Sequence, residues 1–141
     1  MRRGFDSRYP HMKSVAICSS NKFAKEALAF GERLRKLGVV VFTPHFYSAT
    51  IGNFDTIREV DKKFVALGLT YDHFQRIRMA DAVFIYNKGG YIGNSVTLEI
   101  GFAVALGKPI YALEADSREL CREVLFCDLV SSPNALAKRL R

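Results

Sequence analysis

The chain has 141 residues, of which 49% are hydrophobic and 25% are charged. This length is enough to bury one sizeable core and too short for two ordinary domains, so we expect a single globular domain. No stretch approaches the roughly 20 uncharged apolar residues of a membrane helix, and the N-terminus lacks the apolar core of a secretory signal, which predicts a cytoplasmic protein without a membrane partner.

Net charge indicates the kind of partner that the chain binds, and the cysteine content bears on disulfides and metal sites. The 21 Lys and Arg residues outnumber the 14 Asp and Glu residues, which favours an anionic partner. The basic residues are scattered and form no repeated basic and aromatic stripe, so a phosphate-bearing small molecule is favoured over nucleic acid. Cys18, Cys121 and Cys127 form no C-x-x-C pair and are odd in number, which argues against a disulfide framework and a structural zinc site. We expect no metal and no cofactor.

The N-terminal part of the chain predicts a leader followed by the start of an α/β unit. Residues 1–12 are polar and aperiodic and are expected to be a disordered leader or cloning tail, so that the domain spans residues 13–141. The first elements are a strand, a helix and a strand, at Ser14–Cys18, Lys22–Leu37 and Val39–Phe42. The second strand is apolar on both faces, which is typical of a parallel sheet covered by helices on both sides.

The rest of the chain continues this alternation. After a turn-rich loop at His45–Asp55, the segment Thr56–Ala80 predicts one long helix, or two shorter ones with a break at Gly68. The later elements begin with a strand at Asp81–Tyr86, a glycine-bearing loop at Asn87–Asn94, a helix at Ser95–Leu106 and a strand at Lys108–Leu113. A helix at Ser117–Val124, a short strand at Asp128–Val130 and a terminal helix from about Pro133 follow.

This order of elements predicts an α/β fold with a Rossmann-like (flavodoxin-like), doubly wound, mainly parallel sheet of four to five strands. In such sheets ligands bind beyond the carboxyl ends of the strands, near the point where the strand order reverses. The site is therefore expected in the loops Ser19–Lys22, Thr43–Asp55 and Asn87–Asn94.

The helix Ser95–Leu106 carries the best candidate for chemistry. It is apolar nearly all the way round, so it is expected to be buried on most sides, and Glu99 is its only charged residue. An ionised carboxylate in such surroundings is costly unless it is hydrogen-bonded or employed in catalysis. Glu99 shares a helix face with Ser95, towards the loop. The alternative is that Glu99 only favours the positive N-terminal end of its helix; a capping box is excluded because Leu98 occupies the required position.

The glycine-bearing loop ahead of this helix is a second candidate. Gly89 to Gly93 offers backbone N–H groups just before a helix N-terminus, which is a suitable place for phosphate or another anion. The loop lacks the Gly-Lys-Ser/Thr ending of a Walker A motif and does not follow the first strand as a G-x-G-x-x-G motif would. Kinase and dinucleotide-binding functions are disfavoured accordingly.

The segment His73–Leu113 resembles the nucleoside 2-deoxyribosyltransferase family, which includes the 2′-deoxynucleoside 5′-phosphate N-hydrolases. The likeness extends to Ser14–Ser20 and Val41–His45. Its most specific elements are Ala80-Asp81, Glu99-x-Gly101-x-Ala103 and Gly107-Lys108-Pro109. The resemblance implies cleavage or transfer at the N-glycosidic bond of a nucleoside or nucleoside 5′-monophosphate, and a homodimer.

The resemblance also implies roles for individual residues. Glu99 would be the nucleophile that attacks the anomeric carbon of the sugar, forming a covalent glycosyl-enzyme intermediate that water or a second base releases. The family's second acid falls on His73, with Asp72 one position away, and a protonated histidine is able to act as a general acid. His73 as an ordinary helix residue is the alternative.

Several residues are candidates for binding the substrate. Hydroxyl and amide side chains near the loops would hold phosphate or ribose, the glycine loop would hold an anion, and His45 with Phe46 and Tyr47 would stack on a base. The full set is Ser19, Ser20, His45, Gly90, Tyr91, Gly93, Asn94 and Ser95.

Departures from the family pattern keep two other functions open. Ala16 stands where the family's phosphate hydrolases have tyrosine, and Ser95 and Thr97 stand where they have glycine. With the change at His73, these residues keep open a non-catalytic nucleotide-binding or sensor domain. A phosphoribohydrolase of the cytokinin-activating type is the other alternative, because Gly89-Gly90 and Thr97-Leu98-Glu99 echo its motifs, with poorer spacing.

Overall fold

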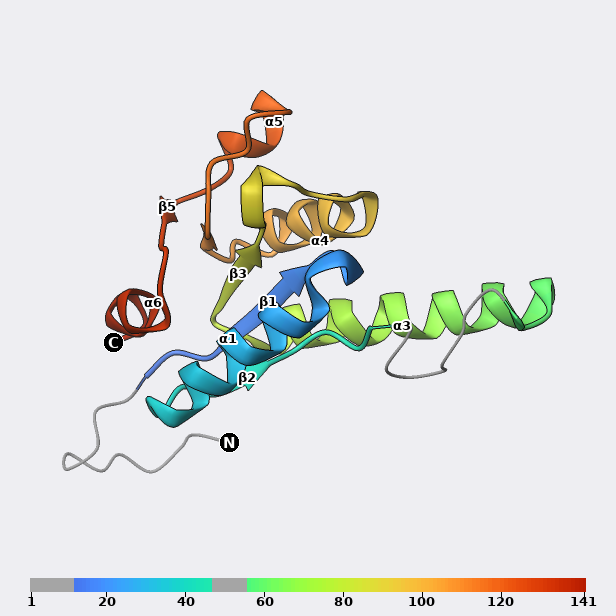
Figure 1. Ribbon diagram of the computed structural model, residues 1–141, viewed down its shortest axis with the longest axis horizontal. Coiled ribbons are helices and arrows are strands. Elements are labelled where there is room, and N and C mark those ends of the chain that lie inside the picture. The colour runs from blue at the N-terminus through green and yellow to red at the C-terminus, as the bar shows by residue number, and fades with distance from the viewer. Residues whose placement is uncertain (1–11, 47–55) are drawn as a thin grey trace.

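The computed structural model describes residues 12–46 and 56–141, in which five strands form one parallel sheet (Figure 1). The strand order is β2-β1-β3-β4-β5, and every neighbouring pair runs parallel. The strands are β1 (Val15–Ser19), β2 (Val41–Phe42), β3 (Ala82–Tyr86), β4 (Ile110–Ala112) and β5 (Asp128–Leu129). This is the order of flavodoxin-like doubly wound sheets, so the predicted fold class is confirmed.

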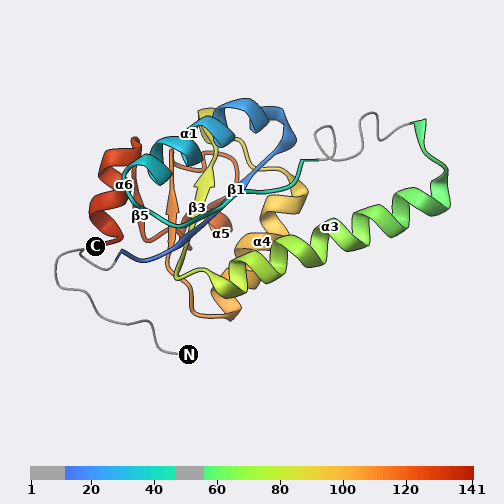
Figure 2. The same cartoon turned by 90° about the horizontal axis from the view of Figure 1, so that it is seen from below.

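Helices cover both faces of the sheet. They are η1 (Asn21–Phe23), α1 (Ala24–Lys36), α3 (Glu59–Met79), η3 (Lys88–Gly90), α4 (Asn94–Ala105), α5 (Leu120–Glu123) and α6 (Pro133–Arg139). Figure 2 shows α1 and α6 on one side of the sheet and α3 and α4 on the other. Each side has its own apolar core, one with α1 and α6 and one with α3 and α4.

The central strand β1 divides its side chains between these two cores. Val15 and Ile17 belong to the core under α1 and α6, whereas Ala16 and Cys18 belong to the core under α3 and α4. All four side chains are fully buried. The alternation follows from the two-residue period of a strand, and burial on both faces explains the uninterrupted apolar run in the sequence. Cys18 is thereby placed beneath α3 and α4, near the carboxyl end of β1.

The long helix α3 is unbroken. It runs for 21 residues through Gly68, so the break considered at that residue is wrong. A glycine inside a helix costs only about 1 kcal/mol relative to alanine, which the flanking helix-forming residues offset. The N-terminal part of α3 projects beyond the sheet (Figure 2). Within the described parts of the chain, no helix is long and apolar enough to cross a membrane.

Helix α4 is not buried on most sides, which corrects the expectation from its apolar sequence. Val96, Ile100 and Ala103 are buried against the sheet, but the outward-facing Leu98 is 63% exposed and Val104 is 42% exposed. The reason is geometric: a helix on the face of a two-sided sheet buries one stripe, and nothing described here covers the opposite stripe. The apolar outer face of α4 is therefore exposed on the surface of the protein.

The glycine-bearing loop after β3 is attached to the segment after β4. The side chain of Asn87 is fully buried, donates to the Glu114 carbonyl at 2.7 Å and accepts from the Glu114 backbone N–H at 3.1 Å. The Gly89 backbone N–H donates to the Glu114 carboxylate at 2.6 Å. Gly89 and Gly90 both have positive φ, and a Cβ on Gly90 would lie 2.6 Å from the Ala115 carbonyl oxygen. Packing therefore requires glycine at position 90.

Matched alanine substitutions separate backbone strain from this clash. Gly89→Ala meets no atom within 4 Å and pays only for positive φ, so we expect it to lower the free energy of unfolding by about 1–2 kcal/mol. Gly90→Ala adds the clash with the Ala115 carbonyl, and we expect a further ~1–3 kcal/mol. Urea unfolding of both variants measures the difference. Equal losses would show that the close contact does not constrain residue 90.

Candidate active site

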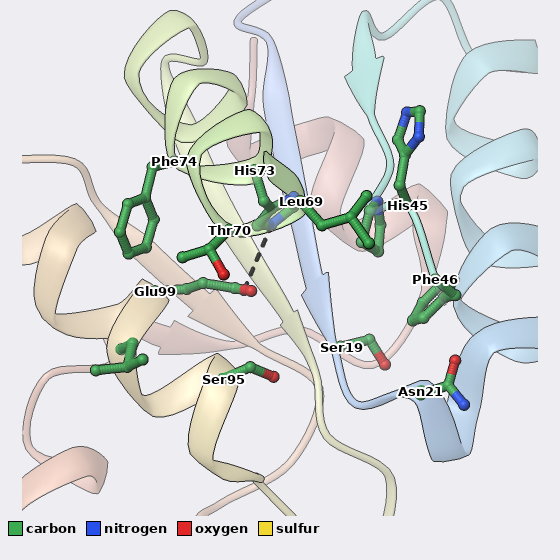
Figure 3. A pocket seen from close by; sticks show the side chains of 12 residues that line it. Ser19, Asn21, His45, Phe46, Leu69, Thr70, His73, Phe74, Ser95 and Glu99 are labelled. Carbon is green, nitrogen blue, oxygen red and sulfur yellow. Dashed lines mark ion pairs between the residues drawn. The ribbon is translucent and has the colours of Figure 1, made fainter. Parts of the chain in front are cut away.

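A pocket opens at the carboxyl edge of the sheet, between α3, α4 and the segments that follow β1 and β2 (Figure 3). It lies beside β1, where the strand order reverses between β1 and β3, which is the usual ligand position in doubly wound sheets. The lining residues are Ser19, Asn21, Pro44, His45, Phe46, Leu69, Thr70, His73, Phe74, Ser95, Leu98 and Glu99. The pocket therefore combines polar and ionisable side chains with apolar ones in similar numbers.

Glu99 and His73 meet in the wall of this pocket. The Glu99 carboxylate comes from α4 and lies 3.4 Å from Nε2 of His73, which comes from α3 (Figure 3). The same Nε2 atom lies 3.3 Å from the Cys18 sulfur, which comes from β1. The side chains of His73 and Glu99 are only 7% and 14% exposed. Among the described residues, His73 Nδ1 and Glu99 Oε2 are buried without a hydrogen-bond partner.

Burial shifts both groups towards their neutral forms. It raises the pKa of Glu99 from 4.5 to about 7, against a smaller opposing effect of a hydrogen bond from the Cys18 thiol. Burial, together with a smaller effect of the nearby Arg76 charge, lowers the pKa of His73 to about 4. The two shifts share one cause, since a poorly solvated site disfavours a charge of either sign. Near pH 7, Glu99 is partly ionised and His73 is neutral.

The neutral His73 ring differs from the protonated acid that the family resemblance implies. A neutral imidazole with a pKa of about 4 holds little of the acidic form at pH 7. Its position against the Glu99 carboxylate suits it to orient that group instead.

Asp72 and His45 belong to a network at the rim. Asp72 accepts a 3.0 Å hydrogen bond from Arg76 Nε, and Arg76 Nη2 donates to His45 Nε2 at 2.6 Å. Asp72 does not line the pocket, whereas His45 does. Asp72 points away because successive helix residues are turned by about 100°, so the neighbour of an inward residue faces elsewhere. The tertiary arrangement thus makes His73, and not Asp72, the neighbour of Glu99.

Two of the three candidate serines line the pocket and the third does not. Ser19 and Ser95 line the pocket. The Ser19 hydroxyl also lies 3.2 Å from the Tyr86 carbonyl, to which it donates. Ser20 lies outside the pocket lining, and its hydroxyl accepts from the Lys22 backbone N–H at the start of η1.

The glycine loop lies apart from the pocket. Gly90, Tyr91, Gly93 and Asn94 are absent from the lining. The Tyr91 ring packs against Phe23, with ring centroids 6.1 Å apart, and the Gly93 carbonyl accepts two hydrogen bonds from Thr97. Asn94 is the exposed first residue of α4. Tyr91 and Gly93 of this loop are thus engaged in contacts within the fold.

Several residues of the site were not predicted. Leu69, Thr70 and Phe74 join His73 on the pocket side of α3, and a helical projection of α3 around His73 would have identified them. Phe74 is held by stacking on Phe102 of α4, with ring centroids 4.4 Å apart. Cys18 was considered only for disulfide and zinc motifs, although its place near the end of the first strand was a usable signal. The loop residue Tyr47, expected to stack on a base, lies outside the described residues.

Comparison with known proteins identifies a family. The family model described as Nucleoside 2-deoxyribosyltransferase matches residues 17–130. No curated protein matches the chain.

Three solved structures have a similar fold. A 2-deoxyribosyltransferase from Bacillus psychrosaccharolyticus is 19% identical, with 88% of this chain and 90% of that chain covered and a TM-score of 0.58. A conserved protein from Enterococcus faecalis V583 is 21% identical, with coverages of 92% and 98% and a TM-score of 0.57. The CMP N-glycosidase BcmB from Clostridium botulinum is 18% identical, with coverages of 91% and 98% and a TM-score of 0.52. At these identities the likeness shows the fold alone.

The raised pKa of Glu99 makes stability depend on pH. The folded chain binds more protons than the unfolded chain between pH 4.5 and 7, so this contribution to stability is present below pH 4.5 and lost as the pH rises through about 7. Glu99→Gln does not ionise, so we expect it to gain up to about 3 kcal/mol over the wild type between pH 5 and pH 8. His73 has the opposite effect between pH 4 and 6.5.

Urea unfolding at the two pH values, with a chelator present so that only protons titrate, measures this gain. The control is Glu32→Gln on α1, because the Glu32 side chain is 62% exposed. A difference between Glu99→Gln and the wild type that stays constant with pH would contradict the assigned shift.

Proposed function

The chain belongs to the nucleoside 2-deoxyribosyltransferase family, as the sequence predicted, and on that basis we propose that it cleaves or transfers the N-glycosidic bond of a nucleoside or nucleoside 5′-monophosphate with Glu99 as the nucleophile. One observation carries this proposal. Among the described residues, Glu99 is the only carboxylate that lines the pocket, and it lies at the ligand edge of the sheet in poorly solvated surroundings. The proposed activity agrees with the names of two proteins of similar fold, a 2-deoxyribosyltransferase and a CMP N-glycosidase.

The proposed reaction has two displacement steps. An ionised Glu99 oxygen attacks the anomeric carbon, the carbon–nitrogen bond breaks, and the base leaves with the electron pair and takes up a proton. Water then attacks the same carbon, gives up a proton and releases the carboxylate, or a second base takes its place. Poor solvation makes the carboxylate more reactive, and it also means that Glu99 is only partly ionised near pH 7 and becomes fully ionised at higher pH.

The remaining lining residues suit a nucleoside. The aromatic rings of Phe46 and Phe74 offer apolar surfaces for a base, and Ser19, Asn21 and Ser95 offer hydrogen bonds to sugar hydroxyls. Arg76 and His45 at the rim place cationic and N–H groups where a 5′-phosphate would approach. Three free thiols agree with the proposed cytoplasmic location.

A non-catalytic nucleotide sensor is the second candidate. The observation in its favour is the neutral His73, because it leaves the pocket without the protonated acid that the family resemblance implies. A sensor of this kind would bind the same nucleosides in the same pocket and release no base.

We also propose that the protein is a homodimer that packs through the outer face of α3. Val60, Phe64, Leu67 and Tyr71 recur at helical spacing, and their exposed fractions are 66%, 78%, 57% and 66%. A continuous apolar stripe of this kind is typical of helix pairing, and burial of four such side chains favours association. The same helix carries His73 into the pocket, so pairing of two copies of α3 would also restrict the movement of His73.

Base release tests the proposed reaction. We expect the wild type to free the base from at least one member of a panel of nucleosides and nucleoside 5′-monophosphates, followed by chromatography. Glu99→Gln keeps the shape and removes the nucleophile, so we expect base release to fall by at least about 10³-fold. The exposed Glu32→Gln is the matched control and should retain full activity. If Glu99→Gln retained full base release, the nucleophile assignment would be wrong, and nucleotide-induced stabilisation without any base release would favour the sensor.

A charge in the α3 stripe tests the dimer. Phe64→Glu places a carboxylate in the proposed interface, and we expect it to convert a dimer into a monomer in light scattering coupled to size exclusion. Leu120→Glu on α5 is the control, because Leu120 is 73% exposed and lies outside the stripe. A wild type that is monomeric, or a Phe64→Glu variant that stays dimeric, would rule out this interface.

A further inference from the structure

Cys18, His73 and Glu99 form a cluster that reaches beyond the proposed reaction. They come from β1, α3 and α4, and one ligand atom of each residue lies within 4.8 Å of the other two. We propose that Cys18 Sγ, His73 Nε2 and the Glu99 carboxylate bind one zinc ion, with the fourth coordination position open to the pocket. The spacing of the three residues along the chain matches no zinc motif, and only the fold brings them together.

Two of the three separations between the ligand atoms agree with tetrahedral zinc. Zinc–sulfur, zinc–nitrogen and zinc–oxygen bonds of about 2.3, 2.0 and 2.1 Å put neighbouring ligand atoms roughly 3.3–3.6 Å apart. His73 Nε2 lies 3.3 Å from the Cys18 sulfur and 3.4 Å from Glu99 Oε2. The third pair, the Cys18 sulfur and a Glu99 oxygen, lies within 4.8 Å, so an ion bound by all three residues would hold these two atoms close together. The ion would also give buried Glu99 Oε2 the partner that it lacks among the described residues.

Charge balance supports the same ligand set. Cys18 is fully buried beside Glu99, so a negative charge on either side chain is costly unless a positive charge balances it. Zinc binding releases the thiol proton and any proton on Glu99 to solvent, and the two anions then balance the charge of the ion. The imidazole of His73 binds a metal in its neutral form and adds no charge to the site. The filled site carries no net charge.

The ligand types select the metal. A thiolate and an imidazole suit zinc and other late transition metals, whereas magnesium and calcium prefer sites built from oxygen atoms. Because His73 and Glu99 line the pocket and Cys18 lies beneath them, the open position faces the pocket. Three protein ligands with one open position are typical of zinc sites that exchange a ligand.

Two consequences follow for affinity and regulation. His73 Nδ1 has no hydrogen-bond partner among the described residues, and the absence of such an outer partner typically weakens metal binding by about 10–100-fold. Binding is therefore expected to be reversible by chelators. A zinc-bound Glu99 is unable to attack a sugar, so zinc is expected to inhibit base release; this consequence rests on the proposed function, whereas the metal site itself does not.

Cobalt binding tests the site, because cobalt(II) reports thiolate ligation by colour. The exposed thiols are first removed in a Cys121→Ser/Cys127→Ser background, which retains Cys18. In this background we expect one equivalent of cobalt(II) to give a thiolate charge-transfer band and tetrahedral visible bands, and zinc to abolish both. We expect Cys18→Ser to lose the charge-transfer band and His73→Gln to bind at least about 10-fold more weakly. Circular dichroism checks that each variant is folded.

The outcomes separate the two proposals. No cobalt spectrum in the background protein, or a charge-transfer band that persists in folded Cys18→Ser, would overturn the metal site. If Cys18→Ser does not fold, the binding of zinc by folded His73→Gln and Glu99→Gln, measured by competition with a coloured chelator, decides: unchanged affinity in both overturns the site. A cobalt spectrum without any base release supports the metal site and counts against the proposed function. Base release without metal binding does the reverse.

Discussion

The rest of the site depends on the burial of one carboxylate. Glu99 is the only charged residue of α4, and α3 and β1 exclude most solvent from it, so its ionised form is costly and its pKa rises to about 7. The same burial keeps His73 neutral and the Cys18 thiol protonated. Three groups that would titrate separately in water are thus held together in uncharged or partly charged forms. A bound cation would stabilise the ionised forms of Glu99 and Cys18, and a sugar would react with the ionised form of Glu99.

The sheet explains why these three residues meet. Strand β1 has α1 and α6 on one face and α3 and α4 on the other, and its two-residue period sends Cys18 to the second face. Helices α3 and α4 pack side by side there, with the Phe74 and Phe102 rings stacked between them. His73 and Glu99 therefore approach each other directly above Cys18. The pocket at the carboxyl edge opens onto the same point, as the topology of doubly wound sheets leads one to expect.

Local sequence patterns predict the elements of this fold better than they predict the contacts between the elements. The alternation of strands and helices was predictable because each element has its own apolar period, and Glu99 was identifiable as a charge within an apolar helix. Glycines in a loop before a helix suggested an anion site, yet Gly90 is required by its contact with the Ala115 carbonyl. The outer face of α4 was expected to be buried because it is apolar, but it is exposed. An apolar sequence does not reveal whether a neighbouring element covers it. A break at Gly68 was a possible interpretation, but one glycine destabilises a helix only modestly, and the helix as a whole determines whether it continues.

The sequence by itself determined the class of fold, the family, and the helix that carries the principal carboxylate. These follow from local periodicity and from motifs that lie within one segment. Only the tertiary structure decided that His73 and not Asp72 faces Glu99, that Cys18 completes the cluster, and that the glycine loop stands apart from the pocket. The physical reason is that Cys18 and His73, 55 residues apart in the chain, are brought to 3.3 Å by the packing of three elements on one sheet face. Periodicity indicates which side of each element is buried, but not which buried side chains become neighbours.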